Sequence, residues 1–573
     1  MIVAQRMCRL SGMNPHSQEF EAVTVAANKA EAPRCYSDLR DHLKALEKEG
    51  LLLTVDVPIN KDTELHPLVR WQFRGGIPEE GRKAFLFTNV TDSKGRKYDM
   101  PVVVGAMAAS PQVYSVGMGC ALDKLSEKWV EAFNRPIAPV EVSEAPCHET
   151  VVEGAELDVP GQGLDGLPVP ISTPGWDNAP YLTNANFITR DPETGVQNVG
   201  NYRGQIKSPR RLGMNTSIEL RTGGYIHWKK WQALGKPMPC AVAVGGPPAV
   251  QYAAVQKVPE ALDELAVAGG LVGGPINVVR CRTVDILVPA EAEIVIEGYV
   301  STEYLEPEGP FGESHGYVNL QEFNGVMEVT CITRRRDAIY SSFISQVSPS
   351  ESSGIRRPAH TMVFLQHLRD VLGIKGVINV SLHEPLTNIR KVCVIQFRRD
   401  TPTTEVWRAL YGAASLQRAS GKLVIAVNDD IDPENSDALL WALAFRSKPH
   451  LDMQIIEHKD GGHGPRDHVR GSEDSALLID ATLKQDYPPV SLPRREFMER
   501  AREIWEDTLG LQKLRPEAPW FGYSLGDWSE ELERQAELAV RGDYWETGKI
   551  AAQRRRSDVE MNTEVAREDD GES

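Results

Sequence analysis

The stretch from about residue 131 to 335 constrains the fold most, because short β-branched runs separated by glycine and proline fill it. Examples are YLTNANFITR, CAVAVG, INVVRCR, AEIVIEG and VMEVTCITRR. Runs of this length and composition predict strands, and many in succession predict a barrel or sandwich. Helical segments such as IHWKKWQALG are inserted between them. We therefore expect a β-rich domain in the middle of the chain.

The flanking segments predict a mixed, multi-domain α/β and β protein. In SDLRDHLKALEKEG, Ser37 is the expected N-cap of a helix and Gly50 its C-terminal stop. Beyond the middle, strands such as KVCVIQF alternate with helices such as TTEVWRALYGAAS, which predicts an α/β domain. A polar tail from about residue 545 has no apolar face and is expected to be disordered.

The predicted division has five parts. They are a flexible N-terminal extension at 1–34, an α+β domain at 35–130, a barrel- or sandwich-like domain at 131–335, an α/β domain at 336–515, and a C-terminal helical extension with a disordered tail at 516–573.

Composition excludes several classes of function. The chain has 573 residues and a net charge of -17, which disfavours a nucleic-acid-binding surface. Its eight cysteines are scattered without a CxxC pair, so we expect reduced core residues and no zinc site. The N-terminus lacks the apolar run of a signal peptide, and no window of 18 apolar residues occurs. We expect a cytoplasmic protein that acts on small molecules.

The segment EPEGPFGESHGY, from Glu306 to Tyr317, is the strongest candidate for chemistry. Proline and glycine break it too often for a regular helix or strand. It could be a surface turn with solvated acids. It could also be a rigid loop that holds Glu308 and Glu313 in one pocket, where two carboxyl groups can have separate pKa values.

Two upstream segments could complete such a site. In TGVQNVGNYRGQIKSPRR, Arg203 follows Asn198 by five positions, and a buried arginine needs a carboxylate or phosphate partner. In VPEALDELAVAGGLVGGP, Glu264 precedes a run of small residues that allows close approach of a ligand. The alternatives are a surface strand and an ordinary helix with a glycine turn. Three further cations could face a phosphate: Lys207, Arg210 and Arg211.

Other clusters are weaker. His463 and His468 fit no standard metal spacing and indicate a mobile polar loop. The acids of VNDDID lack the spacing of a calcium loop, so turn formation and capping are the favoured interpretation. Neither a dinucleotide fingerprint nor a P-loop is present. The residues alone predict a multi-domain enzyme with an arginine and paired glutamates as a possible acid–base site.

The motifs in their order resemble a known family. N-x4-R, a glutamate in a small-residue segment, EIVIEG followed by PEGPFGE-x-HGY, and DDID followed by WALAFR resemble the UbiD family of reversible decarboxylases, from about residue 36 to 510. The resemblance implies a flavin-binding split β-barrel in the middle and a C-terminal α/β domain used in dimerisation. It implies removal or addition of CO2 at an aromatic, heteroaromatic or α,β-unsaturated carbon. The implied catalytic triad is Arg203, Glu308 and Glu313, with Glu313 as the proton donor.

The resemblance also implies cofactors and partners. Family members use prenylated FMN, whose phosphate is held through Mn2+ or Mg2+ with K+ nearby. Asn198 and Glu264 match metal-associated and cofactor-binding positions, and Arg203 also contacts the cofactor. Many members have a histidine where this chain has Gly223 or its neighbour, and His227 lies four residues on. Water or another oxygen could complete the shell. A flavin prenyltransferase as cofactor supplier and a homodimer or larger homo-oligomer are the implied partners.

Three alternatives stay open at this point. The chain could be a carboxylase, or a subunit of a carboxylase complex, acting on a phenolic or thioester substrate. It could be a non-catalytic subunit, although an intact set of Arg203, Glu308 and Glu313 disfavours this. It could also be a conventional flavin oxidoreductase on a split barrel, which the PEGPFGE segment disfavours.

Overall fold

The computed structural model describes residues 34–216, 222–256, 258, 262–382, 391–417, 420–462, 469–471, 473–557 and 560–561. The chain forms two compact units. The first comprises Met1–Asp429 with Ser447–Ala481, and the second comprises Asp430–Arg446 with Thr482–Ser573. Almost all of the predicted N-terminal extension, as well as His463 and His468, lies outside the described residues.

The first unit begins with helix α2, Leu39–Lys48, which buries the three leucines expected from their helical spacing. Its N-cap is Asp38 and not the predicted Ser37. The Asp38 carboxylate accepts a hydrogen bond from the amide of Asp41, and the two residues close a capping box that serine one position earlier cannot form. Gly50 follows the helix with φ of 69°, as expected of a helix stop.

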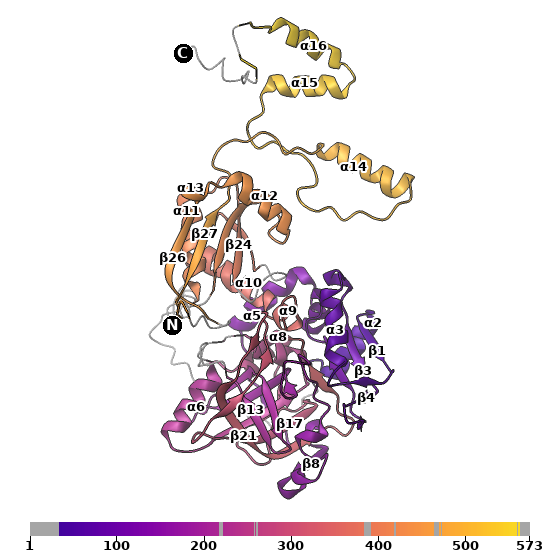
Figure 1. Ribbon diagram of the computed structural model, residues 1–573, viewed down its shortest axis with the longest axis vertical. Helices are drawn as coiled ribbons and strands as arrows, with labels where there is room; N and C mark the ends of the chain where they lie inside the picture. The colour runs from indigo at the N-terminus through magenta and orange to yellow at the C-terminus, as the bar shows by residue number, and fades with distance from the viewer. Residues whose placement is uncertain are drawn as a thin grey trace. The chain divides into compact units, whose positions relative to one another are not determined.

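A four-stranded sheet packs beside α2 and has the order β1-β3-β6-β22. Its strands are β1 (Leu52–Val55), β3 (Ala84–Phe87), β6 (Val102–Val104) and β22 (Tyr340–Ser342). A small sheet and three helices complete this region (indigo to purple in Figure 1): β2 (Ile59–Asn60), β4 (Val90–Thr91), β5 (Lys97–Tyr98), α3 (Leu65–Arg74), α4 (Pro111–Met118) and α5 (Leu125–Asn134). Strand β22 thus joins this sheet from a part of the sequence that follows the whole middle region.

The middle region is a ten-stranded antiparallel sheet, with the path β11-β10-β14-β17-β21-β13-β12-β9 and with β18 and β8 paired to β21. Its strands are β8 (Thr150–Glu153), β9 (Tyr181–Leu182), β10 (Ala185–Arg190), β11 (Gln197–Asn201), β12 (Gly204–Ser208), β13 (Arg211–Met214), β14 (Met238–Val244), β17 (Ile294–Val300), β18 (Glu306–Glu308) and β21 (Glu322–Arg334). The prediction of a β-rich middle domain is confirmed.

One glycine shows how this sheet bends. The register between β17 and β21 shifts at Glu297 and Gly298. A Cβ at Gly298 would lie 2.0 Å from the carbonyl oxygen of Glu328. Only glycine therefore permits this close approach at the bulge. Short hairpins and helices surround the sheet: β7 (Val140–Glu141), β15 (Asn277–Arg280), β16 (Leu287–Pro289), β19 (Phe311–Gly312), β20 (Val318–Asn319), α6 (Gly223–Ala233), α7 (Pro248–Ala254) and α8 (Glu264–Val272).

The first unit ends in an α/β layer with its own hydrophobic core. The sheet order is β23-β24-β25-β27-β26, with β24, β25 and β27 parallel. Its elements are α9 (Glu351–Gly354), α10 (Arg357–Gln366), β23 (Val377–Ser381), β24 (Val392–Phe397), α11 (Thr403–Leu416), β25 (Leu423–Asn428), α13 (Pro449–Asp452), β26 (Met453–Asp460) and β27 (Glu473–Asp480). The predicted α/β alternation is therefore present.

The second unit contains α12 (Ser436–Arg446), α14 (Arg495–Glu503), α15 (Glu530–Val540) and α16 (Tyr544–Gln553). Arg446 binds Asp430 through two hydrogen bonds, of 2.9 Å and 2.6 Å. An acid of the VNDDID segment is thus used in an ion pair. The expectation of disorder from about residue 545 is wrong for α16, which continues to Gln553.

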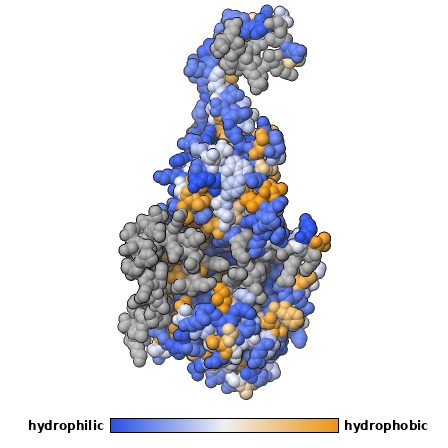
Figure 2. Space-filling view, turned by 90° about the vertical axis from the view of Figure 1, so that its left-hand side faces the viewer, coloured by the Kyte–Doolittle hydropathy of each residue, from blue (hydrophilic) through white to orange (hydrophobic). Residues whose placement is uncertain are grey.

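Most of the described cysteines lie in the protein interior. Cys147, Cys240, Cys281, Cys331 and Cys393 are buried as expected, whereas Cys35 is exposed because it precedes the first packed helix. Among the described residues, no helix is long and apolar enough to cross a membrane. Figure 2 shows one face of the molecule, on which apolar areas in orange are interrupted by hydrophilic surface in blue.

Candidate functional site

Arg203 joins both acids of the PEGPFGE segment. It lies between β11 and β12, where its backbone bridges to Asn215. Its Nε and Nη2 donate to the two carboxylate oxygens of Glu308 at 2.9 Å and 2.8 Å, and its Nη1 donates to Oε1 of Glu313. β18 brings Glu308 to this place by pairing with β21, and Glu313 follows β19 directly. The structure thus brings these three predicted residues together.

The network is buried and strongly coupled. The Arg203 side chain is 8% exposed, that of Glu308 0% and that of Glu313 13%. Asn215 and Asn324 also donate to Oε2 of Glu308, at 3.0 Å and 3.3 Å. Burial alone would lower the pKa of Arg203, but the two glutamates outweigh it and raise that pKa. The guanidinium therefore stays charged, and four donors hold the Glu308 carboxylate.

Two glycines fix the backbone that carries the acids. Gly309 has φ of 102°, a region that side chains rarely adopt, and a Cβ at Gly312 would lie 2.1 Å from Oγ1 of Thr173. The segment is not entirely irregular as predicted, because β18 and β19 are short strands. Pairing with neighbouring strands supplies the rigidity that the local sequence lacks.

Aromatic rings cover the arginine. The Phe311 ring lies 5.0 Å from the Arg203 guanidinium carbon, within the range of a cation–π contact. Tyr181 packs on Phe311 with 4.5 Å between ring centroids and donates to the carbonyl of Pro310 at 3.3 Å. Burial and the Glu308 charge raise the pKa of Tyr181, so this hydroxyl stays neutral.

Asp177 is a third acid beside this network, and the sequence did not single it out. Its carboxylate accepts hydrogen bonds from the amides of Thr173, at 2.7 Å, and Gly312, at 3.0 Å. Burial raises its pKa to about 6, although these hydrogen bonds and Arg203 act in the opposite direction. In the sequence, GWDNAP is typical of a turn, so only the tertiary contact with Gly312 reveals the residue.

Asn198 and Glu264 form a second cluster. Glu264 is the first residue of α8, and its Oε2 accepts a hydrogen bond of 2.8 Å from the amide of Val199, the neighbour of Asn198. Burial, followed by the nearby charge of Asp263, raises the pKa of Glu264 to about 8, with the Val199 hydrogen bond opposing. No ion pair involves Glu264 in the described part of the chain. The structure thus brings these two predicted residues together.

Tyr202, which the sequence did not single out, belongs to the same cluster. Its hydroxyl accepts hydrogen bonds from the Asn198 side-chain amide at 3.4 Å and the Gly224 backbone at 3.1 Å. A Cβ at Gly223 would lie 1.9 Å from Oδ1 of Asn198, and one at Gly224 would lie 2.8 Å from the Tyr202 ring. With Asn198 and Tyr202 in these positions, neither Gly223 nor Gly224 could carry a side chain.

His227, four residues after Gly223, is hydrogen-bonded to Thr189 in the protein interior. Its Nδ1 lies 2.9 Å from Oγ1 of Thr189, and burial lowers its pKa to about 4. It is a neutral histidine of the protein interior. Among the described residues, no group of three or more histidine, cysteine, aspartate or glutamate side chains could hold a metal ion.

The donor set nevertheless fits a hard cation. Asn198, Glu264 and Tyr202 offer amide, carboxylate and hydroxyl oxygen, which suit Mg2+ or Mn2+ better than soft metals. A buried carboxyl group whose pKa is raised is also a group that a nearby cation would stabilise in its charged form.

The predicted phosphate-facing cations have other partners. Lys207 lies 3.4 Å from Glu306 and Arg210 lies 3.1 Å from Asp158. Arg211 contacts Glu306 as well. Strands β12 and β13 and the turn between them place these side chains beside acidic ones, and their contact with a phosphate stays a prediction.

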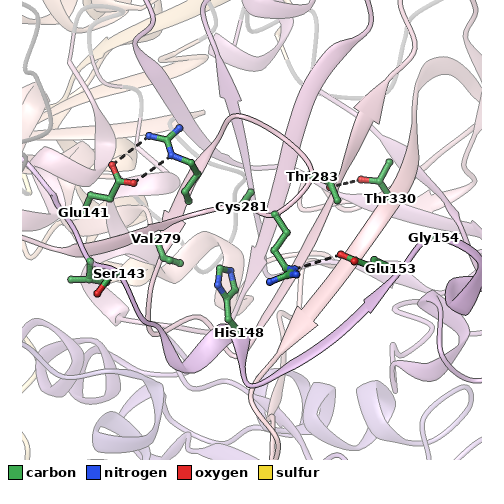
Figure 3. Close-up of a pocket in the computed structure, with 12 residues that line it drawn as sticks. Glu141, Ser143, His148, Glu153, Gly154, Val279, Cys281, Thr283 and Thr330 are labelled. Carbon is green, nitrogen blue, oxygen red and sulfur yellow. Dashed lines mark hydrogen bonds and ion pairs between the residues drawn. The ribbon is translucent and has the colours of Figure 1, made fainter.

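A cavity of about 830 Å³ lies elsewhere, between β7, β8, β15 and β21 (Figure 3). None of the predicted site residues lines it. Arg280 faces Glu141 at 3.4 Å and Arg282 faces Glu153 at 3.5 Å, so the opposite charges of its wall are matched. The cavity therefore indicates no class of ligand.

Comparison with known proteins identifies the family. Three domain profiles of 3-octaprenyl-4-hydroxybenzoate carboxy-lyase match: the N-terminal domain at residues 43–133, the Rift-related domain at 139–347 and the C-terminal domain at 357–481. The chain belongs to the UbiD family. It is therefore a carboxy-lyase by family, and the sheet of its middle region fits a flavin-binding domain.

Solved UbiD-class structures have the same fold. HmfF from Pelotomaculum thermopropionicum, in complex with FMN, is 29% identical with a TM-score of 0.69, over 79% of this chain and 95% of that one. An evolved dimeric form of HmfF with prFMN is 29% identical with a TM-score of 0.68, over 80% and 97%. Apo 3,4-dihydroxybenzoic acid decarboxylase from Klebsiella pneumoniae (AroY) is 25% identical with a TM-score of 0.68, over 81% and 99%.

Proposed function

We propose that the chain is a reversible, non-oxidative decarboxylase of an aromatic, heteroaromatic or α,β-unsaturated carboxylic acid that depends on prenylated FMN. The observation that carries the proposal is the buried network in which Arg203 binds both Glu308 and Glu313. Its family gives the reaction class, and the name of the Klebsiella relative, a 3,4-dihydroxybenzoic acid decarboxylase, supports an aromatic substrate.

The two glutamates have different roles in this proposal. Glu308 is fully buried and held by four donors, so it keeps the Arg203 guanidinium in place as an ion. Glu313 retains 13% exposure and follows a strand end, so it is the acid that reaches the substrate. In its protonated form it donates a proton to the carbon from which CO2 has left.

The cofactor is proposed to bind through Asn198, Glu264 and Arg203. When bound, prenylated FMN supplies an electron sink for the carbon that loses CO2. Asn198 and Glu264 would hold Mn2+ or Mg2+ against its phosphate, with K+ nearby. The Tyr202 hydroxyl orients the Asn198 amide and thereby the oxygen that faces the cation.

Reconstitution tests the proposal. Apo-protein is loaded with prenylated FMN or plain FMN and mixed with 3,4-dihydroxybenzoic, furan-2-carboxylic or cinnamic acid. We expect CO2 release from at least one acid with prenylated FMN only, and incorporation of label from 13C-bicarbonate into that acid. Equal CO2 release with plain FMN, or none with any of these acids, contradicts the proposal.

We further propose that a flavin prenyltransferase supplies the cofactor, that the protein acts in the cytoplasm, and that residues 336–515 form a dimerisation domain. An evolved dimeric form of HmfF supports self-association. Light scattering of the holoenzyme is expected to give at least twice the monomer mass of 63.5 kDa. A monomer at micromolar concentration would contradict it.

A further inference from the structure

The Asp177 carboxylate connects two segments of backbone. One oxygen accepts the amide of Thr173 at 2.7 Å, within its own turn. The other accepts the amide of Gly312 at 3.0 Å, 135 residues along the chain. This amide belongs to the Phe311–Gly312 peptide, so Asp177 holds the peptide unit directly before the proposed proton donor, Glu313.

A second contact fixes the same peptide. Oγ1 of Thr173 lies so close to Gly312 that a Cβ there would be 2.1 Å away. The turn from Thr173 to Asp177 therefore contacts Gly312 through both a hydrogen bond and tight packing. A peptide held on two sides has little freedom to rotate, and this restricts where the Glu313 side chain can lie.

The charges around Arg203 add a separate argument. Arg203 binds Glu308 and Glu313 and lies within electrostatic reach of Asp177, so three acids surround one guanidinium. The Tyr181 hydroxyl is within electrostatic reach of Glu308, Arg203 and Asp177. These three charged groups therefore lie close enough to influence one another. Among the described residues, Lys207 of β12 adds a positive charge within electrostatic reach of Glu308, although its ammonium lies 3.4 Å from Glu306, and the ring of His315 is hydrogen-bonded to Asn319.

We propose that Asp177 is a positioning residue for Glu313: it fixes the Phe311–Gly312 peptide, directly before Glu313, and adds a third negative charge to the network around Arg203. The negative charge favours the protonated form of Glu313, which is the form that a proton donor needs. This inference rests on the proposed function. Asp177 acts on Glu313 through the Gly312 backbone and is not itself the donor.

The test compares Asp177→Asn with wild type as prenylated-FMN holoenzymes, on whichever acid of the panel wild type decarboxylates. Asparagine has the shape of aspartate but keeps only one acceptor oxygen and no charge. We expect kcat/KM for CO2 release to fall about 10- to 100-fold through misplacement of Glu313. The high-pH limit of kcat/KM should move to lower pH, because loss of a like charge lowers the pKa of Glu313. FMN content should stay unchanged.

Asp165→Asn is the matched control. Asp165 also accepts a backbone amide within a loop, from Gly161 at 2.6 Å, but has no contact with the Arg203 network. This control should retain the wild-type rate and pH limit. Asp177→Glu keeps the charge and should keep the wild-type pH limit even where its rate falls.

The outcomes separate this inference from the proposed function. Absence of CO2 release by wild type overturns the proposed function and this inference with it. A wild-type rate and pH limit in Asp177→Asn overturn the inference alone. A lower rate with the wild-type pH limit also overturns it. A loss of folding stability or of bound flavin would then be enough to explain the lower rate.

Discussion

Two polar clusters adjoin β11 and the residues that follow it, Tyr202 and Arg203, but they differ in how their charges are satisfied. Around Arg203, the protein itself supplies the counter-charges, and Glu308 accepts four hydrogen bonds from side chains. Around Glu264, a buried carboxyl group with a pKa raised to about 8 accepts hydrogen bonds from backbone amides, one of them that of Val199, and has no cation beside it among the described residues. The first cluster is complete without a ligand, whereas the second has the chemistry of a site that a cation completes.

The difference arises from alternation along the strand. The Asn198 side chain contacts Tyr202, whereas the next residue, Arg203, contacts Glu308, as expected where successive side chains of an extended chain point to opposite sides. One segment can thus serve both a catalytic and a cofactor-binding cluster. Substitutions in the Arg203 cluster should lower the rate of the reaction, and substitutions in the Glu264 cluster should weaken cofactor retention.

The largest expected effect is that of Glu313→Gln. Glutamine has nearly the same shape but cannot deliver a proton, so CO2 release should fall about 10²- to 10⁴-fold. Exchange of the product's ring proton with D2O should fall equally, because exchange uses the same proton transfer. Both are measured by NMR on the flavin-loaded variant, with exposed Glu303→Gln as control. Wild-type exchange in Glu313→Gln removes Glu313 from the donor role.

Glu308→Gln should affect folding as well as chemistry. Breaking a buried ion pair leaves Arg203 without its main counter-charge and costs about 3 kcal/mol of stability. Urea unfolding of the apo-protein measures this. Glu306→Gln, on the same strand, removes a 26%-exposed acid and should cost less than about 1 kcal/mol. Equal losses in the two variants would contradict the assignment of the buried network.

Glu264→Ala tests the incomplete cluster. The loss of a proposed ligand should weaken Mn2+ retention at least about 10- to 100-fold, the size seen for supporting groups of metal sites. Metal content is measured by mass spectrometry and plain FMN content by absorbance, so no substrate is needed. Glu297→Gln is the control, because Glu297 is also buried but binds backbone amides of Arg282 and Thr283. Unchanged metal and flavin in Glu264→Ala would show that the cluster binds no cation.

The smallest effect is expected for His227→Gln, which should keep wild-type Mn2+ content at pH 7. The pKa of His227 is about 4 in the folded protein, below its usual value. The neutral ring therefore contributes stability that is present above about pH 6.5 and is lost as the pH falls through 4, with about 1.4 kcal/mol for each unit of pKa shift. The unfolding free energy of the variant should fall less between pH 7 and 4. A loss of metal would instead make His227 part of the cation site.

Local patterns predicted much of the secondary structure. The leucine spacing of α2, the apolar runs of β14 and β17, and the alternation of β24, α11 and β25 depend on periodicity that a short window contains. The N-cap at Asp38 and the helix α16 were missed, because neighbouring polar residues compete for a cap and because α16 has little apolar signal. β22 joins the N-terminal sheet from residue 340, which no local pattern indicates.

The sequence by itself determined which residue types could form the site and the order in which they occur: Asn198, Arg203, Glu264, Glu308 and Glu313. The tertiary structure decided which of them meet. Arg203 is 105 residues from Glu308 and 110 from Glu313, and the pairing of β18 with β21 brings them within hydrogen-bonding distance. Asp177 and Tyr202 join their clusters only through the register of strands and the space left by glycines. Local sequence sets backbone preference over a few residues, whereas contacts across a sheet depend on every strand between them.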